Sequence, residues 1–239
     1  MSIARFVEIY KSQGILVAIH KAFKFGPIIV IKSIGQALFN INSTAYWNYR
    51  LLLNWNNAGG PEQTIDFAES FFKHVDFAKI EFNSIIDFGC ALGDSSTVFR
   101  KHNERLEIFL WDFSSVGLNA AVRRNKKYNV KKWDLITKAD LVYCSNVIEH
   151  VIDTSSFVAD LCSASKRWVC IQGPYNEKHA DGKLITPEDP NGEHVWTIDD
   201  AFINKFFALP IFEKNTTFIG EASKGWPFGK QFYFIGKLK

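Results

Sequence analysis

One segment, SIIDFGCALGDSS at residues 84–96, constrains the fold more than any other part of the chain. The apolar residues before Asp87 indicate a buried strand that ends at this acid. Asp94, Ser95 and Ser96 are favourable N-cap residues for a helix that begins there. A strand, a glycine-bearing turn and a helix start in this order place backbone amides and a helix N-terminus beside a ligand.

The remainder of the chain alternates between strand-like and helix-like segments. A helix is expected over residues 62–75, and strands are expected at residues 84–87, 107–111, 130–133, 141–144 and 168–172. This alternation predicts an α/β fold with a parallel sheet covered on both faces. Near the end, the β-rich runs NTTFIGEA and KQFYFIGKL predict an antiparallel hairpin that closes the sheet with a reversed strand.

The composition is that of a globular protein, with 239 residues, 47% of them hydrophobic and 22% charged. This length predicts one domain with an appendage. The net charge of +3 is spread along the sequence apart from VRRNKKYNVKKW, which reads as a solvated helix end, so we expect no nucleic-acid partner. The four cysteines lack metal-site spacing, which predicts buried free thiols and a cytoplasmic protein.

The N-terminal segment GILVAIHKAFKFGPIIVIKSIG is apolar but interrupted. Lys21, Lys24 and Lys32 divide it, and Gly26 with Pro27 breaks it, so no apolar run reaches the roughly 18 residues of a spanning helix. We predict that residues 1–45 form a helical appendage of two short amphipathic helices, packed on the main domain or on a second subunit of a homodimer. Peripheral membrane contact through these helices is the alternative.

The turn after the first strand departs from a dinucleotide-binding fingerprint. The pattern G-x-G-x-x-G finds Gly89, then Ala91, then Asp94 at its glycine positions. Asp94 would repel a pyrophosphate, by about 1 kcal/mol at 4 Å in water and more when desolvated. A ligand with a cationic centre and an amine, and no phosphate, suits Asp87 better.

The segments IIDFGCALGD, IFLWDFS and ADLVYCSNVIEHV, in this order, resemble three motifs of the class I S-adenosylmethionine-dependent methyltransferases, of the type 11/12-like kind. The resemblance covers about residues 45 to 239 and assigns residues 46–239 to a methyltransferase domain. The family usually has a glycine where this chain has Ala91. The resemblance implies a Rossmann-like, doubly wound, mostly parallel seven-stranded sheet with a reversed C-terminal strand, and S-adenosylmethionine as cofactor.

The resemblance also implies cofactor-binding residues. The methionine part of the cofactor would be lined by Asp87, Gly89, Ala91 and Gly93, and the ribose would be bound at Asp112 and Phe113. The adenine would contact Asp134 and Leu135, and Ser145 lies at the end of the fourth strand. An acid at the end of the second strand accepts both ribose hydroxyls in this family. A helix cap or a surface acid is the alternative for Asp112.

The pair Glu149 and His150 is the candidate catalytic feature. Family members that methylate oxygen carry a similar segment beside the transfer site, and a histidine can deprotonate a hydroxyl at neutral pH. The alternative is structural, with Asn146 as N-cap and Glu149 as its capping-box partner.

A Glu-x-x-Glu-His run holds a divalent metal in the ubiquinone-pathway and small-RNA O-methyltransferases. Asn146 stands in place of the first acid here, which leaves two ligands rather than three. We therefore predict no metal, with a divalent cation kept as the alternative.

Two further segments are candidates for the acceptor site. The long connection over residues 173–195 carries His194, a reserve candidate for the base, and places Tyr175 and Trp196 near the rim. Tyr46, Trp47 and Arg50 resemble a substrate lid, although tryptophans at such spacings can equally be core. We expect both segments to lie over the transferred methyl group.

These features together predict an enzyme that methylates an oxygen of a hydroxylated small molecule or a glycan, as in surface-polysaccharide pathways. N- or C-methylation of a small molecule is an alternative, although SNVIEH differs from the Asn-Pro-Pro-Tyr segment of many N-methylating members. A non-catalytic nucleotide-binding module of the same fold is the other alternative.

Overall fold

The computed structural model describes residues 40–78, 80–220 and 229–239. The chain divides into two compact units, residues 1–60 and 61–239. The first unit contains helix α3 (Thr44–Leu53), and the predicted N-terminal helices lie almost entirely outside the described residues. Within the described part of the chain, no helix has the length and apolar character needed to cross a membrane.

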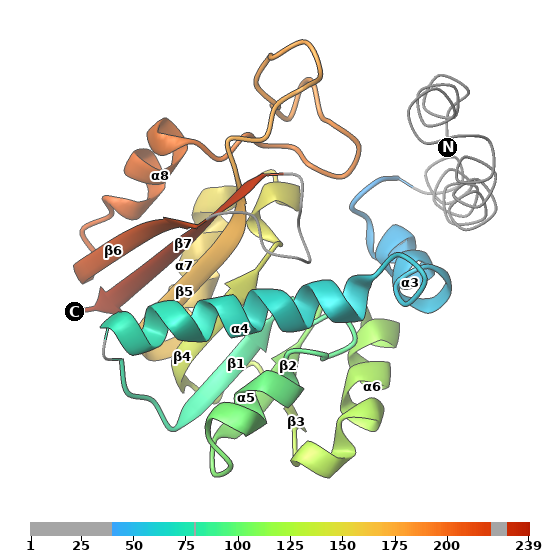
Figure 1. Cartoon of the computed structure of the whole chain (residues 1–239), viewed down its shortest axis with the longest axis vertical. Coiled ribbons are helices and arrows are strands. Elements are labelled where there is room, and N and C mark those ends of the chain that lie inside the picture. The colour runs from blue at the N-terminus through green and yellow to red at the C-terminus, as the bar shows by residue number, and fades with distance from the viewer. Residues whose placement is uncertain (1–39, 79, 221–228) are drawn as a thin grey trace, which may run out of the picture. The chain divides into compact units, whose positions relative to one another are not determined.

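The second unit is built on a seven-stranded sheet of order β3-β2-β1-β4-β5-β7-β6 (Figure 1). The strands are β1 (Ser84–Phe88), β2 (Glu107–Trp111), β3 (Lys131–Lys132), β4 (Ala139–Ser145), β5 (Ser165–Tyr175), β6 (Phe212–Gly220) and β7 (Lys230–Leu238). Strands β1 to β5 pair in parallel, and β7 runs antiparallel to both β5 and β6. The predicted mostly parallel sheet with a reversed C-terminal strand is confirmed.

Helices cover both faces of this sheet, as the alternation of segments predicts. They are α4 (Gly60–Ala78), α5 (Ser96–His102), α6 (Ser115–Arg124), α7 (Thr154–Ala164) and α8 (Asp200–Phe207), with short 3₁₀ helices η1 (Lys126–Tyr128) and η2 (Ile148–His150). Apolar residues of α4, α5 and α6 pack on one face, and those of α7 and α8 pack on the other.

Neighbouring residues of each central strand serve opposite faces. Ile85 joins the core under α4 and α5, whereas Ile86 joins the core under α7; Leu141 and Val142 divide in the same way. All four are fully buried. A strand buried on both faces reads as a continuous apolar run, which is why the sequence located β1 and β4.

The four cysteines are free and buried, as predicted. Burial raises the pKa of each thiol, so none is a ready nucleophile.

Candidate active site

The turn after β1 is tied to the end of β2 by its own backbone. The N–H groups of Gly89 and Cys90 donate to the carbonyl oxygen of Trp111, at 2.8 and 3.0 Å. The N–H of Ala91 donates to Asp112 Oδ2 at 2.9 Å. The turn needs left-handed backbone at Gly89 (φ +83°) and also at Ala91 (φ +49°), the position where the family usually has glycine.

Gly89 is required for a second reason, which yields a testable prediction. A Cβ at this position would lie 2.4 Å from Val147 Cγ2. We expect Gly89→Ala to lower the free energy of unfolding by about 1–2 kcal/mol for the left-handed backbone, with a further loss from the clash. Denaturant unfolding of Gly89→Ala, Val147→Ala and the double variant measures the coupling between the two sites.

Gly182→Ala is the matched control, because Gly182 has φ +86° and nothing within 4 Å of an added Cβ. It should show the backbone cost alone. Equal losses in Gly89→Ala and Gly182→Ala, with no coupling to Val147, would contradict the clash.

Asp87 is the fourth residue of β1, a strand that is buried throughout, and is only 3% exposed. Burial raises its pKa to about 7, against the opposing effect of a hydrogen bond that Ser95 Oγ donates to it. The carboxylates of Asp112 and Asp94 raise it further. Ser95 is thus the N-cap residue of α5 by position, but its side chain makes no capping hydrogen bond and is used to hold Asp87.

Asp112 follows β2 and is also buried, at 9% exposure. Its two oxygens accept from the N–H groups of Ala91 and Ser114, at 2.9 and 2.8 Å. Burial raises its pKa to about 6, and these hydrogen bonds oppose the rise. Each carboxylate oxygen has a further lone pair, so Asp112 can still accept two hydroxyl donors from a ligand.

Asp94 does not present the isolated charge that the sequence suggests. Arg124 of α6 pairs with it at 3.0 Å between Nη2 and Oδ1. This pair offsets the negative charge at the start of α5, which weakens the electrostatic argument against a phosphate ligand. The buried acids Asp87 and Asp112 are now the stronger reason to expect a ligand that brings hydrogen-bond donors or a cation.

The other predicted cofactor residues lie around this edge in different settings. A Cβ on Gly93 would meet Ala121 of α6 and Asn125, the C-cap of that helix, so this glycine allows the helix to pack closely. The remaining ones are exposed or half-buried: Phe113, Asp134, Leu135 and Ser145. The Asp134 carboxylate accepts from the backbone of Thr137 and Ile136, which lowers its pKa. Their contact with the cofactor stays a prediction.

The predicted catalytic residues Glu149, His150 and His194 come together, although 44 positions separate the last two. One nitrogen or oxygen atom from each lies within 4.8 Å of the others, so the three could hold a metal ion. Glu149 is 1% exposed. Burial raises its pKa to about 7, with an opposing effect from His194. Burial alone would lower the pKa of His194, but its hydrogen bond to Glu177 and the nearby carboxylates raise it overall.

The capping-box alternative for Asn146 and Glu149 is wrong. The segment after β4 forms the short 3₁₀ helix η2, and its N-cap position falls on Val147 without a side-chain hydrogen bond. Asn146 has a left-handed backbone (φ +53°) and donates from Nδ2 to Ser145 Oγ. Glu149 is therefore buried beside the two histidines for a reason other than capping.

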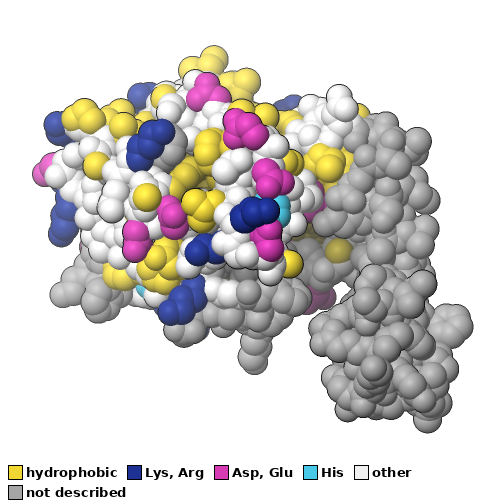
Figure 2. Space-filling view, turned by 90° about the horizontal axis from the view of Figure 1, so that it is seen from above, with side chains coloured by type: hydrophobic (Ala, Val, Ile, Leu, Met, Phe, Trp, Pro, Cys, Tyr) yellow, Lys and Arg dark blue, Asp and Glu magenta, His cyan; other side chains and the backbone are white. Residues whose placement is uncertain are grey.

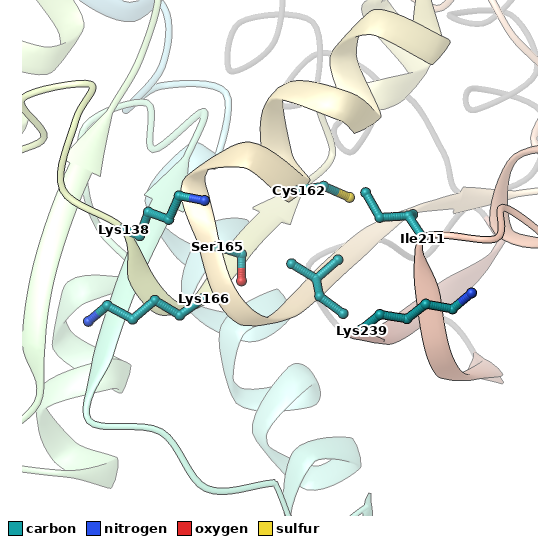
Figure 3. Close-up of a pocket in the computed structure, with 7 residues that line it drawn as sticks. Lys138, Cys162, Ser165, Lys166, Ile211 and Lys239 are labelled. Carbon is teal, nitrogen blue, oxygen red and sulfur yellow. The ribbon is translucent and has the colours of Figure 1, made fainter.

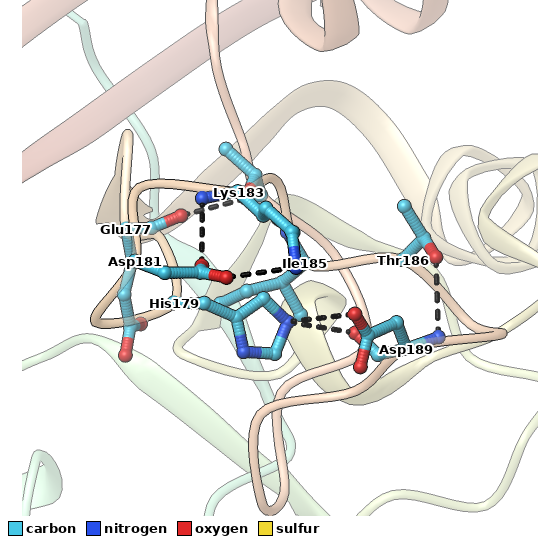
Figure 4. Close-up of polar contacts among 8 residues, drawn as sticks. Glu177, His179, Asp181, Lys183, Ile185, Thr186 and Asp189 are labelled. Carbon is cyan, nitrogen blue, oxygen red and sulfur yellow. Dashed lines mark hydrogen bonds and ion pairs between the residues drawn. The ribbon is translucent and has the colours of Figure 1, made fainter.

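Residues 176–199 connect β5 to α8 as an ordered loop with its own hydrogen bonds (Figure 4). His179 Nε2 contacts the carbonyl oxygen of Asp189 at 3.0 Å, and Lys183 pairs with Asp181 at 2.8 Å. The loop docks on η2 through Val195, whose N–H donates to the Glu149 carbonyl at 2.7 Å. Figure 2 looks down on this edge of the molecule and shows acidic side chains gathered beside a histidine.

The predicted acceptor residues are buried or half-buried. Trp196 donates to the Val151 carbonyl at 2.9 Å and packs on Phe202, and the hydroxyl of Tyr175 donates to Asp200 at 2.8 Å. In the first unit, Tyr46 is fully buried, while Trp47 and Arg50 are half-buried. Their roles in binding an acceptor, and the placement of the two segments over the methyl group, stay predictions.

A surface pocket of about 520 Å³ lies at the opposite, amino end of β4 and β5 (Figure 3). It is lined by Lys138, Cys162, Ser165, Lys166, Ile211, Leu238 and Lys239. None of these belongs to the motifs at the carboxyl edge. Because ligands of open α/β sheets bind at the carboxyl ends of strands, this pocket is not the cofactor site.

Sequence reasoning missed two partners of the site. Glu177 contacts His194 across 17 positions, and Arg124 contacts Asp94 across 30. Neither lies within a motif, and no local spacing relates the members of either pair. Only the folded chain brings them together.

Comparisons with known proteins agree with this geometry. The sequence model of one protein family, described as a methyltransferase domain, matches residues 53–208. Among curated proteins, none matches the sequence.

Solved structures share the fold at low sequence identity. The plantazolicin methyltransferase BpumL, in complex with a desmethyl plantazolicin analogue and S-adenosylhomocysteine, aligns with a TM-score of 0.61 at 12% identity, covering 90% of this chain and 98% of its own. Magnesium protoporphyrin IX methyltransferase (ChlM) from Synechocystis PCC 6803, with bound S-adenosylmethionine, gives 0.52 at 16% identity, with coverages of 87% and 97%. A methyltransferase from Aquifex aeolicus gives 0.53 at 15% identity, with coverages of 74% and 93%.

Proposed function

Because the chain belongs to the family of class I S-adenosylmethionine-dependent methyltransferases, we propose that it methylates a hydroxyl oxygen of a small-molecule acceptor. The observation that carries this proposal is the cluster of Glu149, His150 and His194 at the carboxyl end of β4. An alcohol is a poor nucleophile until its proton is removed, and this cluster offers imidazole and carboxylate groups for that purpose.

The residues at the carboxyl ends of β1 and β2 fit the cofactor. Asp87 and Asp112 are buried carboxyls with raised pKa values, so hydrogen-bond donors or a positive charge brought by a ligand would stabilise their ionised forms. Asp112 would accept the ribose hydroxyls, and Asp87 would face the amino group and sulfonium charge. When bound, the cofactor supplies a methyl group on a sulfonium, which is a good leaving group.

The chain's own part in the reaction is then orientation and proton removal. Holding the acceptor oxygen in line with the methyl group accounts for much of the acceleration in such a displacement. The loop over residues 176–199 contributes His194 and contacts η2 through Val195, so it would help to position the acceptor at the cluster.

A small-molecule acceptor is supported by the names of structural neighbours, which describe methyltransferases of plantazolicin and of magnesium protoporphyrin IX. The proposal of a glycan acceptor is based on the aromatic side chain of Trp47 and its neighbours in the first unit. The predicted cytoplasmic location and the homodimer or membrane contact of the N-terminal segment remain proposals of the same kind.

Cofactor binding is the first prediction of this function. We expect S-adenosylhomocysteine to bind the purified chain in a calorimetric titration, and NAD to bind far more weakly, because the segment over residues 89–94 lacks two of the three glycines of a dinucleotide site. Tighter binding of NAD, or no binding of S-adenosylhomocysteine, would contradict the proposal.

A second assay tests the acceptor class. Release of S-adenosylhomocysteine is measured with panels of hydroxylated and of amine acceptors matched in size. Turnover with hydroxylated compounds supports O-methylation, and turnover with amines alone would replace it by N-methylation.

A further inference from the structure

Two glutamine side chains are buried at the carboxyl edge of the sheet without the hydrogen bonds that an amide needs. Gln172 of β5 and Gln231 of β7 are both 0% exposed. Within the described part of the chain, Oε1 and Nε2 of Gln231 have no hydrogen-bond partner, and Nε2 of Gln172 has none. The remaining atom, Gln172 Oε1, accepts from the hydroxyl of Tyr143 at 3.3 Å. Buried polar groups are nearly always paired, so two such amides require an explanation.

The two amides face the same side of the sheet and lie close together. Gln172 is opposite Tyr233 in the pairing of β5 with β7, and Gln231 is two residues from Tyr233 on the same strand. Side chains two apart along a strand share a face, and diagonal neighbours of this kind are about 7–8 Å apart. One ligand can therefore contact both amides.

Asp87 projects to the same face of the sheet. It is opposite Tyr143 in the pairing of β1 with β4, and Ser145 is opposite Gln172 in the pairing of β4 with β5. Since Tyr143 and Ser145 are two residues apart, Asp87 and Gln172 share a face. They are two strands apart, which corresponds to roughly 10 Å at the usual strand spacing. A cofactor at Asp87 and an acceptor at the amides would therefore be neighbours along one edge.

The amides also lie beside the candidate catalytic residues. A Cβ on Gly173, the residue after Gln172, would be 3.3 Å from Glu149 Oε2. Successive residues of a strand face opposite sides, so Glu149 lies against the other side of the strand that carries Gln172. A molecule placed over the end of β5 would reach Glu149 on one side and the amides on the other.

We propose that Gln172 and Gln231 bind the acceptor, by holding an uncharged group that both donates and accepts hydrogen bonds, such as an amide or a second hydroxyl. The inference deepens the proposed O-methyltransferase function, on which it rests. The unpartnered atoms define this chemistry, because they offer amide N–H groups from both side chains and one carbonyl oxygen from Gln231.

The charges nearby favour a neutral group over an anionic one. The carboxyls of Asp87 and Glu149 are buried, and burial raises the pKa of each to about 7. A further negative charge at the amides would be repelled by their ionised forms. A carboxylate or a phosphate is therefore a poor ligand for this position.

The amides are covered but lie near the end of the sheet. Gln231 is opposite Pro174, and the next pair, Tyr175 with Lys230, ends both strands. Tyr175 is half-buried and Lys230 is exposed. Binding thus requires only a local opening at this edge.

Replacing Gln231 by an apolar side chain of similar shape tests whether its amide is unpaired. We expect Gln231→Met to raise the melting temperature by about 2–4 °C, because the folded chain gains no hydrogen bond from the amide that it buries. Gln172→Met should change the melting temperature less, since it also loses the bond from Tyr143. A lower melting temperature, or failure of Gln231→Met to fold, would overturn the proposal, because the amide would then already be satisfied.

Asn125→Leu is the control for a buried amide that is paired. Asn125 Nδ2 donates to the carbonyl oxygens of Ala121 and Leu92, at 2.9 and 3.2 Å. This variant should therefore melt at a lower temperature than the wild type. The opposite signs of Asn125→Leu and Gln231→Met are the expected result.

Three phenols that differ only in the group opposite the hydroxyl test the ligand class. They are 4-hydroxybenzamide, 4-hydroxybenzoate and 4-ethylphenol, and methyl glucoside is added as a probe with several hydroxyls. Binding to the full chain in the presence of S-adenosylhomocysteine is measured by calorimetry. We expect either the benzamide or methyl glucoside to bind about 10-fold more tightly than 4-ethylphenol, the effect of about one neutral hydrogen bond, and Gln231→Met to remove this preference.

The same titrations identify the source of the neutral group. Preference for the benzamide indicates an amide, and preference for methyl glucoside indicates a second hydroxyl. Tighter binding of 4-hydroxybenzoate than of the benzamide, or no preference for either neutral polar probe, would overturn the proposal.

Turnover separates this inference from the proposed function. Gln231→Met should raise the KM for a hydroxylated acceptor and leave the affinity for S-adenosylhomocysteine unchanged. If wild type and Gln231→Met methylate hydroxylated compounds with the same KM, only the role of the amides fails. If no hydroxylated compound is methylated, the proposed function fails, and the melting and binding results still decide whether the amides hold a ligand.

Discussion

Replacing His150 by alanine is expected to lower turnover with a hydroxylated acceptor by about 10²–10⁴, the usual contribution of a positioned general base. The imidazole is held by the Glu193 carbonyl at 2.8 Å and stands 3.9 Å from Glu149, so it is fixed beside the other members of the cluster. The loss is expected because the ring would accept the proton of the acceptor hydroxyl. Rates of S-adenosylhomocysteine formation at saturating cofactor measure it.

Affinity for S-adenosylhomocysteine should not change in His150→Ala, because the predicted cofactor carboxylates belong to β1 and the end of β2. His179→Ala serves as the control and should retain turnover. If His150→Ala remains active while His194→Ala is inactive, the base is His194. If both variants remain active, proximity alone accounts for the reaction and the cluster has no catalytic role.

The Asp112→Ala substitution is expected to weaken S-adenosylhomocysteine binding by about 1–3 kcal/mol, the cost of losing charge-assisted hydrogen bonds to the ribose. The affinity of Asp112→Asn should lie between those of the wild type and Asp112→Ala. The amide keeps one acceptor oxygen for the Ala91 N–H but loses the charge. Calorimetric titration of the folded variants provides the affinities.

Asp153→Ala is the control for a lost carboxylate. Asp153 caps α7 by accepting from the Ser156 N–H at 3.0 Å, so its removal should lower stability by about 1 kcal/mol and leave cofactor affinity unchanged. Unchanged affinity in Asp112→Ala would mean that the ribose lies elsewhere.

The raised pKa of Asp112 predicts how cofactor affinity depends on pH. Asp112 has a pKa of about 6 in the folded protein, raised from 3.8 by burial, and the bound ribose requires its ionised form. The contribution of Asp112 to affinity should be full well above pH 6 and should fall as the pH drops through 6, because binding must then release a proton. The apo protein should behave in the opposite way: the raised pKa makes Asp112 favour folding as the pH falls from 6 towards 4.

Asp87, with a pKa of about 7, adds a second titration close by. In Asp112→Asn the fall in affinity between pH 6 and 5 should be reduced, while the contribution of Asp87 remains. A wild-type profile that is flat between pH 7 and 5 would contradict both assignments.

The fold could be predicted from the sequence because its signals are local. Most of the parallel strands appeared as short apolar runs, because β1 and β4 are buried on both faces and most of their residues are apolar. The hairpin of β6 and β7 followed from two β-rich runs around a short loop. The strand that the sequence marks least clearly is also the shortest one. β3 holds only Lys131 and Lys132, and both are exposed.

The ends of these strands were also predictable, and with them the motif residues. A parallel sheet brings the carboxyl ends of its strands to one edge, so the sequence positions of Asp87, Asp112 and Glu149 place them there without further information. The chemical type of the ligand follows from these acids.

The tertiary structure decided how these residues are used. Ser95 holds Asp87 and does not cap its helix, Arg124 neutralises Asp94, and Glu177 orients His194. Each is a contact between side chains whose separation in sequence has no relation to their separation in space, so no periodicity or spacing could indicate it.

Glu149 and His150 were therefore a pair in the sequence and became part of a triad only in the folded chain. The loop after β5 is held by hydrogen bonds within itself and contacts η2. This contact places His194 at the carboxyl edge of the sheet. The sequence by itself determined the family, the sheet and the edge at which the chemistry occurs. The tertiary structure alone brought His194 to Glu149 and His150, because this depends on the path of a loop that no local pattern specifies.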